Sequence, residues 1–168
     1  MIQVRTSVFE TNSSSIHSIC IARGDRRKPK DWETTIVLTV TMQHFGWEFR
    51  KLDTPDLRAS YAYTAAVDLD LGADMKELIW ELCGEEGINV VFQDSDDAYF
   101  YGVDHCDGTY DFVKALLHNK RLLKDFIFCK NSCVFTGNDN SEAPSKLALD
   151  EDSWHDKNPG GIIYFKSN

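Results

Sequence analysis

Three side chains near the N-terminus have the residue types that metal-free RNA cleavage requires. Such cleavage needs a base to activate the 2′-hydroxyl, an acid for the leaving oxygen, and a cation or hydrogen-bond donors for the crowded phosphate. Glu10 and His17 can exchange protons, and Arg5 supplies a fixed positive charge. We therefore predict Arg5, Glu10 and His17 as candidate catalytic residues. The alternative for His17 is that it packs at the loop end of an apolar strand face.

A run of small polar side chains lies between Glu10 and His17. A turn needs only one or two such residues, and Asn and Ser side chains also stabilise turns by bonding to neighbouring backbone groups. Clustered hydroxyls, an amide and exposed backbone N–H groups can instead grip a phosphate or hold a ribose. Both interpretations stay open. The candidate RNA-binding residues of this loop are Asn12, Ser13, Ser14 and Ser15.

Two segments rich in Ile, Val, Thr and Phe flank this polar loop and predict the strands of an N-terminal β-hairpin. A register in which Phe9 faces Ile16 puts His17 on the apolar face and Arg5 on the opposite face. Arg5 and His17 can then cooperate only if a bulge re-aims one of them. The two predicted strands are residues 2–9 and 16–22.

The rest of the chain predicts an α+β fold with a mostly antiparallel sheet and about three helices against it. Helices are expected to begin near Pro55, at a cap on Asp74 and after residues 107–109. Further strands are expected at 34–40, 88–93 and 161–165, a second hairpin at 126–129 and 133–136, and a long surface loop at 137–158. We expect residues 1–168 to be a single domain, with 1–23 as the hairpin and 24–168 as an α+β body.

The charge distribution restricts the partners. With 27 acids against 18 bases, a net charge of −9, the chain should repel bulk DNA and RNA and suit a basic protein partner. Residues 1–30 carry six bases and two acids, a net +4, which leaves −13 for the remainder. Phosphate contacts are therefore expected near the N-terminus, where the densest cations, and further candidate RNA-binding residues, are Arg26, Arg27 and Lys28.

Other classes of site have weaker signals. The five cysteines contain no Cys-x-x-Cys pair, so we expect reduced, mostly packing thiols. The acidic segment 94–97 lacks the glycine and final glutamate of a calcium-binding loop, so no metal site is predicted, and the sequence identifies no cofactor. No apolar run is long enough to span a bilayer and no secretory signal is evident, which predicts an intracellular protein without membrane contact.

Two motifs resemble a known group of proteins. Residues 5–18, RTSVFETNSSSIHS, are similar to a signature at the start of many uncharacterised proteins of phages and other bacterial mobile elements, with the pattern R-x-x-x-F-x-x-N-S-S-S-x-H-S. The later segment 135–140, FTGNDN, resembles another part of the same family. The size, acidity and N-terminal hairpin further resemble type II-A anti-CRISPR proteins that inhibit the RNA-guided effector nuclease by promoting truncation of its guide RNA.

This resemblance implies a function carried by the N-terminal hairpin in the cytoplasm of a bacterial host cell. The implied partners are a type II CRISPR effector nuclease and its guide RNA. The protein could cleave as an effector-dependent endoribonuclease, or it could make the complex cut its own guide. An alternative is a non-enzymatic acidic decoy that blocks guide or target binding, and a third is a phage protein with another host target. The residues that fit the family pattern are Arg5, Glu10, Asn12, Ser13, Ser14 and His17.

Overall fold

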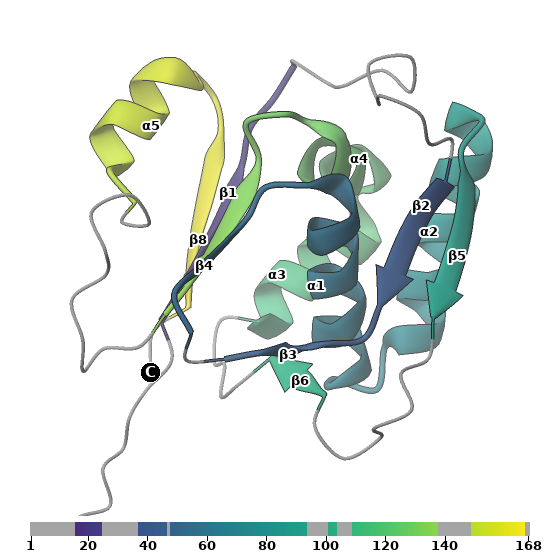
Figure 1. The fold of residues 1–168 in the computed structure, drawn as a ribbon. Coiled ribbons are helices and arrows are strands. Elements are labelled where there is room, and N and C mark those ends of the chain that lie inside the picture. The colour runs from purple at the N-terminus through teal and green to yellow at the C-terminus, as the bar shows by residue number, and fades with distance from the viewer. Residues whose placement is uncertain are drawn as a thin grey trace, which may run out of the picture.

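A four-stranded antiparallel sheet and a central helix organise the protein (Figure 1). The computed structural model describes residues 16–24, 37–46, 48–93, 101–103, 109–137 and 149–166, with the backbone alone for 165 and 166. They form an α+β fold with a mostly antiparallel sheet, as the sequence predicts. The sheet has the order β4-β7-β1-β8, and its strands are β1 (His17–Ile21), β4 (Arg50–Leu52), β7 (Cys133–Thr136) and β8 (Ile162–Lys166).

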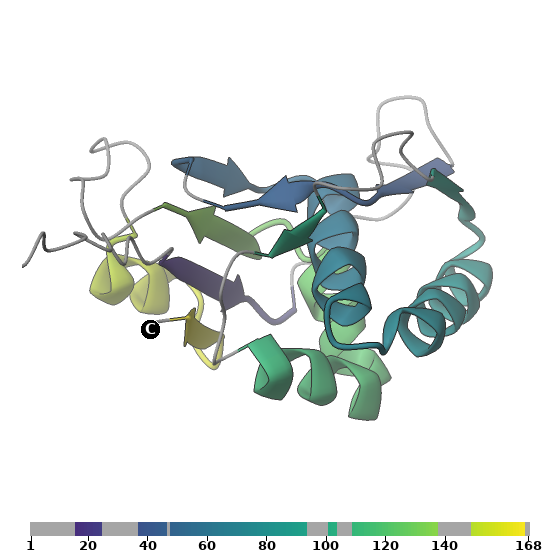
Figure 2. The same ribbon diagram turned by 90° about the horizontal axis from the view of Figure 1, so that it is seen from below.

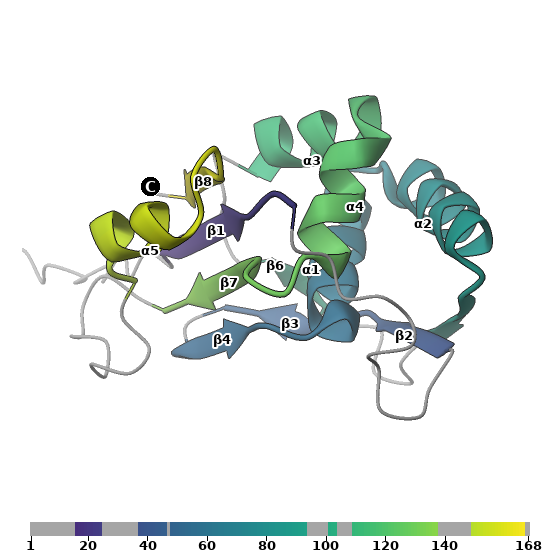
Figure 3. The ribbon, with the colours of Figure 1, turned by 90° about the horizontal axis from the view of Figure 1, so that it is seen from above.

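The helices lie on both sides of this sheet. Figures 1 and 3 show α5 on one side and α1, α3 and α4 on the other. The helices are α1 (Pro55–Val67), α2 (Gly72–Glu86), α3 (Thr109–His118), α4 (Lys120–Phe128) and α5 (Glu151–Lys157). Two short parallel pairs complete the described structure: β2 (Val37–Thr41) with β5 (Asn89–Gln93), and β3 (His44–Phe45) with β6 (Gly102–Val103).

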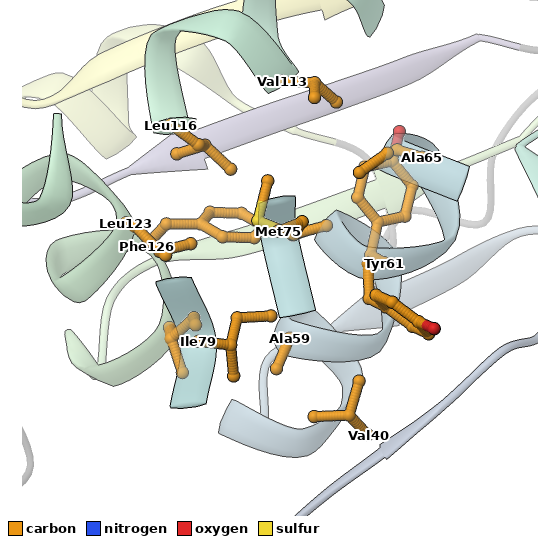
Figure 4. Close-up of a cluster of buried hydrophobic side chains, with 14 of the residues drawn as sticks. Val40, Ala59, Tyr61, Ala65, Met75, Ile79, Val113, Leu116, Leu123 and Phe126 are labelled. Carbon is orange, nitrogen blue, oxygen red and sulfur yellow. The ribbon is translucent and has the colours of Figure 1, made fainter. Parts of the chain in front are cut away.

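Helix α1 occupies the centre of the fold, between the sheet on one side and α2 and β5 on the other (Figures 1 and 2). The Thr54 side chain caps its first turn by accepting from the Leu57 N–H at 3.3 Å, and Pro55 follows the cap. Every residue from 58 to 66 is buried, so α1 packs against neighbours all around its circumference. Figure 4 shows side chains from α1, α2, α3, α4 and β2 meeting in this core, among them Val40, Tyr61, Met75, Leu116 and Phe126.

A polar stripe on α1 binds the backbone of β2. The Thr39 N–H donates to the Asp56 carboxylate at 2.6 Å, and the Thr41 N–H donates to the Ser60 hydroxyl at 3.0 Å. One turn further on, the Thr64 hydroxyl accepts from the Gln43 N–H at 3.3 Å. Four helical residues rise about 6 Å and two strand residues about 6.6 Å, so the two spacings match. The stripe therefore provides hydrogen-bond acceptors for the backbone N–H groups along the edge of β2 that has no strand partner among the described residues.

The strand predicted at residues 16–22 exists as β1, and both of its edges are paired. Ser18 faces Phe135 of β7 on one side and residue 165 of β8 on the other. The predicted partner segment, residues 2–9, lies outside the described residues. Because β1 is an interior strand between two strands from the C-terminal third of the chain, the expected division between residues 1–23 and 24–168 does not coincide with a break in the sheet.

The predicted second hairpin is wrong in its first half, because residues 126–128 end helix α4. The Asn119 side chain caps this helix by accepting from the Leu122 N–H at 3.0 Å. Leu122, Leu123, Phe126 and Ile127 recur at helical spacing and are all buried. The aromatic and β-branched run at 126–129 is typical of a strand, but burial of one helix face outweighs that local preference.

Two further boundaries differ from the sequence prediction. Helix α5 lies within the expected surface loop at 137–158, where the Asp150 side chain caps it by accepting from the Ser153 N–H at 3.1 Å. Helix α2 begins at Gly72, so Asp74 lies in the first turn, where a carboxylate still favours the helix dipole. The sequence predicts that this helix ends near Gly84 or Gly87, and α2 ends at Glu86 with Gly87 as its C-cap. The φ of Gly87 is 70°, a left-handed conformation that glycine adopts without strain.

Arg58 is fully buried although it carries a permanent charge. Its Nη1 donates to the Asp53 carbonyl at 2.8 Å and also to the Ser132 carbonyl, and its Nε donates to the Ile127 carbonyl at 3.1 Å. One side chain thus holds the chain after β4, the last turn of α4 and the residue before β7. Burial of this charge is tolerated because several carbonyl dipoles replace water around the guanidinium.

Replacing Arg58 should therefore destabilise the whole fold. Arg58→Ala is expected to lower the free energy of unfolding by about 3 kcal/mol or more, because two buried carbonyls and a partly buried one lose a donor. Arg58→Lys should restore only part of the lost free energy of unfolding, since one ammonium group cannot donate to all three carbonyls with the geometry of the planar guanidinium. Chemical denaturation followed by circular dichroism measures both. The exposed Arg121→Ala control should stay within about 0.5 kcal/mol, and an equally small change in Arg58→Ala would contradict the assignment.

Candidate functional site

Among the predicted site residues, the structure describes His17. The other predicted catalytic and RNA-binding residues lie outside the described ranges: Arg5, Glu10, Asn12, Ser13, Ser14, Ser15, Arg26, Arg27 and Lys28. The first described residue, Ile16, leads directly into β1 and is 40% exposed. The candidate site is therefore built from the described segments that adjoin the motif.

His17 is buried and hydrogen-bonded on both ring nitrogens. Its Nε2 lies 3.3 Å from the Gly46 carbonyl, and its Nδ1 lies 3.0 Å from the Tyr61 hydroxyl. A carbonyl oxygen can only accept, so Nε2 carries the proton of a neutral ring and Nδ1 accepts from the tyrosine. The rings of His17 and Tyr61 are 5.8 Å apart. His17 thus ties the start of β1 to α1 and to the turn after β3.

This position favours the packing interpretation of His17 over the prediction that it acts as a catalytic acid or base. The side chain has 0% exposure, so RNA cannot reach the ring in this structure. Both nitrogens also have protein partners. The other interpretation, in which His17 packs at the loop end of the apolar face, agrees with its neighbours: Ile19 and Ile21 share that face and belong to the core.

The described ends of the two motif segments, residues 16–18 and 135–137, are neighbours in the structure although they lie more than one hundred residues apart in the chain. The Ile16 N–H donates to the Gly137 carbonyl at 2.9 Å, and Ser18 lies opposite Phe135. Figure 3 shows the two strands, β1 and β7, side by side. We call this place the motif junction, defined as residues 16–18 and 135–137.

Close packing holds the β7 side of the motif junction. The Thr136 hydroxyl donates to the Glu48 carbonyl at 2.6 Å and accepts from the Arg50 N–H at 3.2 Å. A Cβ on Gly137 would lie 2.4 Å from the Phe49 ring, so this close approach requires glycine. The backbone leaving β7 is therefore held beside the backbone entering β1.

Lys51, which is not among the residues predicted from the sequence to form the site, lies beside the motif junction. Lys51 is exposed on β4, and its Nζ lies 5.7 Å from the centroid of the Phe135 ring. The Phe135 side chain is half-buried. An isolated lysine on a three-residue strand has no periodic or cluster signal, and only the pairing of β4 with β7 brings it to Phe135.

A second surface is an acidic groove between α2 and α3. It has a volume of about 490 Å³ and an apolar floor that includes Leu71, Leu78 and Leu117. Three exposed carboxylates from α2 line one wall, and one of them, Glu81, pairs with Lys120 at 3.1 Å. The α3 wall carries one lysine and one histidine. The carboxylates of this acidic groove are Asp74, Glu77 and Glu81. Such a surface can take a partner segment that combines cations with apolar side chains.

The described residues meet neither the requirements of a metal site nor those of a membrane-spanning helix. Within the described ranges, no three His, Cys, Asp or Glu side chains come close enough together to hold a metal ion. The acidic segment 94–97 lies outside those ranges. No helix in the described part of the chain combines the length and apolarity that crossing a membrane requires.

Replacing His17 should lower stability rather than only remove a reacting group. His17→Ala is expected to lower the free energy of unfolding by about 2–4 kcal/mol, because it creates a cavity and removes the buried partner of Tyr61. Thermal or chemical denaturation measures the change. The matched control is His44→Ala, an exposed histidine on β3, which should stay within about 0.5 kcal/mol. A His17→Ala protein as stable as the control would contradict the packing role of His17.

The motif junction and the acidic groove are the two described surfaces that bear on the predicted function. The resemblance to anti-CRISPR proteins remains a prediction that rests on the motif residues. No protein-family model, curated protein or solved structure matches the chain.

Proposed function

We propose that this protein inhibits a type II RNA-guided effector nuclease by causing truncation of its guide RNA. In this proposal the segment before β1 contacts the RNA, and the folded body binds the effector. Arg5 and the hydroxyls of residues 13–15 hold the phosphate. Glu10 accepts the proton of the 2′-hydroxyl while that oxygen attacks the phosphorus, and the displaced 5′-oxygen takes a proton from water. His17 positions the segment by holding the start of β1 against α1, and does not touch the RNA.

The observation that carries the proposal is the motif junction. The resemblance uses two segments, and a shared function requires that they act at one place. The hydrogen bond from Ile16 to Gly137, and the pairing of Ser18 with Phe135, bring them to the same end of two adjacent strands. The junction also keeps an open side, since Ile16 is exposed and Phe135 is only half-buried.

The separation of charge supports a division of labour. The acidic groove carries exposed carboxylates on the body, whereas residues 1–30 have a net charge of +4. An effector that binds a guide RNA has a strongly basic channel, so an acidic surface is attracted to it. A cationic N-terminal segment can then approach the bound RNA, which an acidic body alone would repel.

A guide-RNA assay tests the proposal. The protein is incubated with effector and end-labelled guide, and the RNA is separated on a denaturing gel. A shorter, discrete guide is expected with effector present and intact guide without it. Arg5→Ala and the double variant Ser13→Ala/Ser14→Ala should each slow truncation by about tenfold or more.

The controls separate loss of chemistry from loss of folding. Arg121→Ala, an exposed change on α4, should truncate the guide as the unmodified protein does. Each variant is first compared with the unmodified protein by circular dichroism. A guide that stays intact while effector activity is lost would contradict truncation, and unchanged truncation by all motif variants would remove the segment before β1 from the mechanism. A chelator in one reaction shows whether a divalent metal takes part.

The acidic groove favours a second candidate function, a decoy that blocks the effector without cutting its guide. This decoy shares the docking surface of the first proposal but predicts intact RNA. Both functions make one common prediction. The double variant Asp74→Lys/Glu77→Lys should bind the effector about tenfold more weakly at low salt, because two attractive charges become repulsive.

Affinity measured at two salt concentrations checks this prediction. The loss should shrink as salt rises, since screening weakens both attraction and repulsion. The matched control is the double variant Glu151→Lys/Asp152→Lys on α5, which changes two exposed acids on the other side of the sheet and should alter affinity little. Equal effects of the α2 and α5 variants would show that only net charge matters and that the groove is not the docking surface.

A further inference from the structure

Two free thiols lie directly opposite one another on β1 and β7. Cys20 and Cys133 are register partners, and both are free and buried. The Ile16–Gly137 bond sets the alternation of hydrogen-bonded pairs along these strands, so Cys20 and Cys133 form a hydrogen-bonded pair. Such pairs have Cα atoms about 5.5 Å apart, inside the range of roughly 4.4–6.8 Å that a disulfide spans.

Cys133 also lines a surface pocket of about 330 Å³ on the side of the sheet where α5 lies. Three lysines line the same pocket: Lys51, Lys130 and Lys157. Among the described residues lining it, the carboxylate is Asp53, which lies 3.7 Å from Lys51. The pocket is therefore locally cationic on a protein whose net charge is −9.

The surroundings make Cys133 the thiol that ionises first. The hydrogen bond with Cys20 lowers the pKa of the Cys133 thiol, and Lys51 and Arg58 act in the same direction. Burial and the Asp53 carboxylate oppose them. The same hydrogen bond, together with burial, raises the pKa of the Cys20 thiol. Cys133 can therefore attack a disulfide as a thiolate while Cys20 stays protonated beside it.

We propose that the lysine-lined pocket is a thiol-modification site, in which Cys133 reacts with small anionic disulfides and Cys20 resolves the product. This inference is independent of the function proposed above. The Cys133 thiolate attacks one sulfur of the reagent, so that a mixed disulfide forms and one thiolate leaves. Cys20 then loses its proton to solvent and attacks the Cys133 sulfur, which releases the second thiolate and leaves a Cys20–Cys133 disulfide. The protein loses two electrons, and the disulfide reagent gains them.

Titration with a dianionic aromatic disulfide, dithiobis(nitrobenzoate), tests the site under native conditions. Every protein in the series carries Cys106→Ala, because Cys106 lies outside the described residues. Cys129 is buried, and burial raises the pKa of the Cys83 thiol to about 12, so neither should react quickly. We expect two coloured thiolates per protein, with a product lighter by two hydrogen atoms whose digest contains linked Cys20 and Cys133 peptides.

Single replacements separate attack from resolution. Cys20→Ala should release one thiolate and keep one nitrobenzoate bound at Cys133, and Cys133→Ala should lose the fast reaction. Circular dichroism first shows whether each variant is folded. If Cys133→Ala does not fold, the disulfide-linked Cys20 and Cys133 peptides of the Cys106→Ala protein decide the outcome. Absence of those peptides, or a fast reaction that survives Cys133→Ala in a folded protein, overturns the proposal.

The lysines are tested by comparing the dianionic reagent with dithiodipyridine, a neutral disulfide. Lys157→Gln should slow the dianionic reagent about threefold and leave the neutral reagent unchanged, because only the anion is attracted by the missing charge. The matched control is Lys114→Gln on α3, outside this pocket, which should alter neither rate. Equal slowing of both reagents by Lys157→Gln would show that the pocket does not select anions.

Discussion

The buried guanidinium of Arg58 is the interaction on which the arrangement of the other elements depends. Its hydrogen bonds to three carbonyls hold together the end of β4, the end of α4 and the start of β7. Strand β4 lies more than sixty residues before α4 and β7 in the chain, so the guanidinium joins two distant parts of the sequence. A buried charge is costly unless dipoles surround it, so the guanidinium disfavours any arrangement that does not bring these carbonyls together.

Helix α1 extends this constraint to the rest of the molecule. The stripe of Asp56, Ser60 and Thr64 binds the backbone of β2, and Tyr61 holds His17 at the start of β1. A helix buried all around its circumference must satisfy polar groups as well as pack apolar ones. Helix α1 does this by using a different part of its circumference for each neighbouring element.

The positions of β1 and β7 connect this scaffold to function. Because β1 is an interior strand, the segment before it starts from a fixed point beside Gly137. The same pairing that creates the motif junction also places Cys20 opposite Cys133. The pairing of β1 with β7 therefore underlies both proposals. The proposed RNA-binding segment adjoins one end of this pair of strands, and the proposed thiol site lies at the other end. The acidic groove lies on different elements, α2 and α3, so the proposed docking of an effector can vary independently of both.

The sequence by itself determined the elements whose signals are local. The Thr54-Pro55 start of α1, the Gly87 end of α2 and the short apolar strands β5 and β8 were predictable, because caps, turns and periodicity act over a few residues. The identity of α4 was not, since a run such as Phe-Ile-Phe fits a strand or a buried helix face equally well. Only the tertiary structure decided the burial of His17, the approach of Lys51 to Phe135 and the adjacency of the two motif segments. Each of these depends on the order and register of strands distant in the chain, which short-range preferences do not encode.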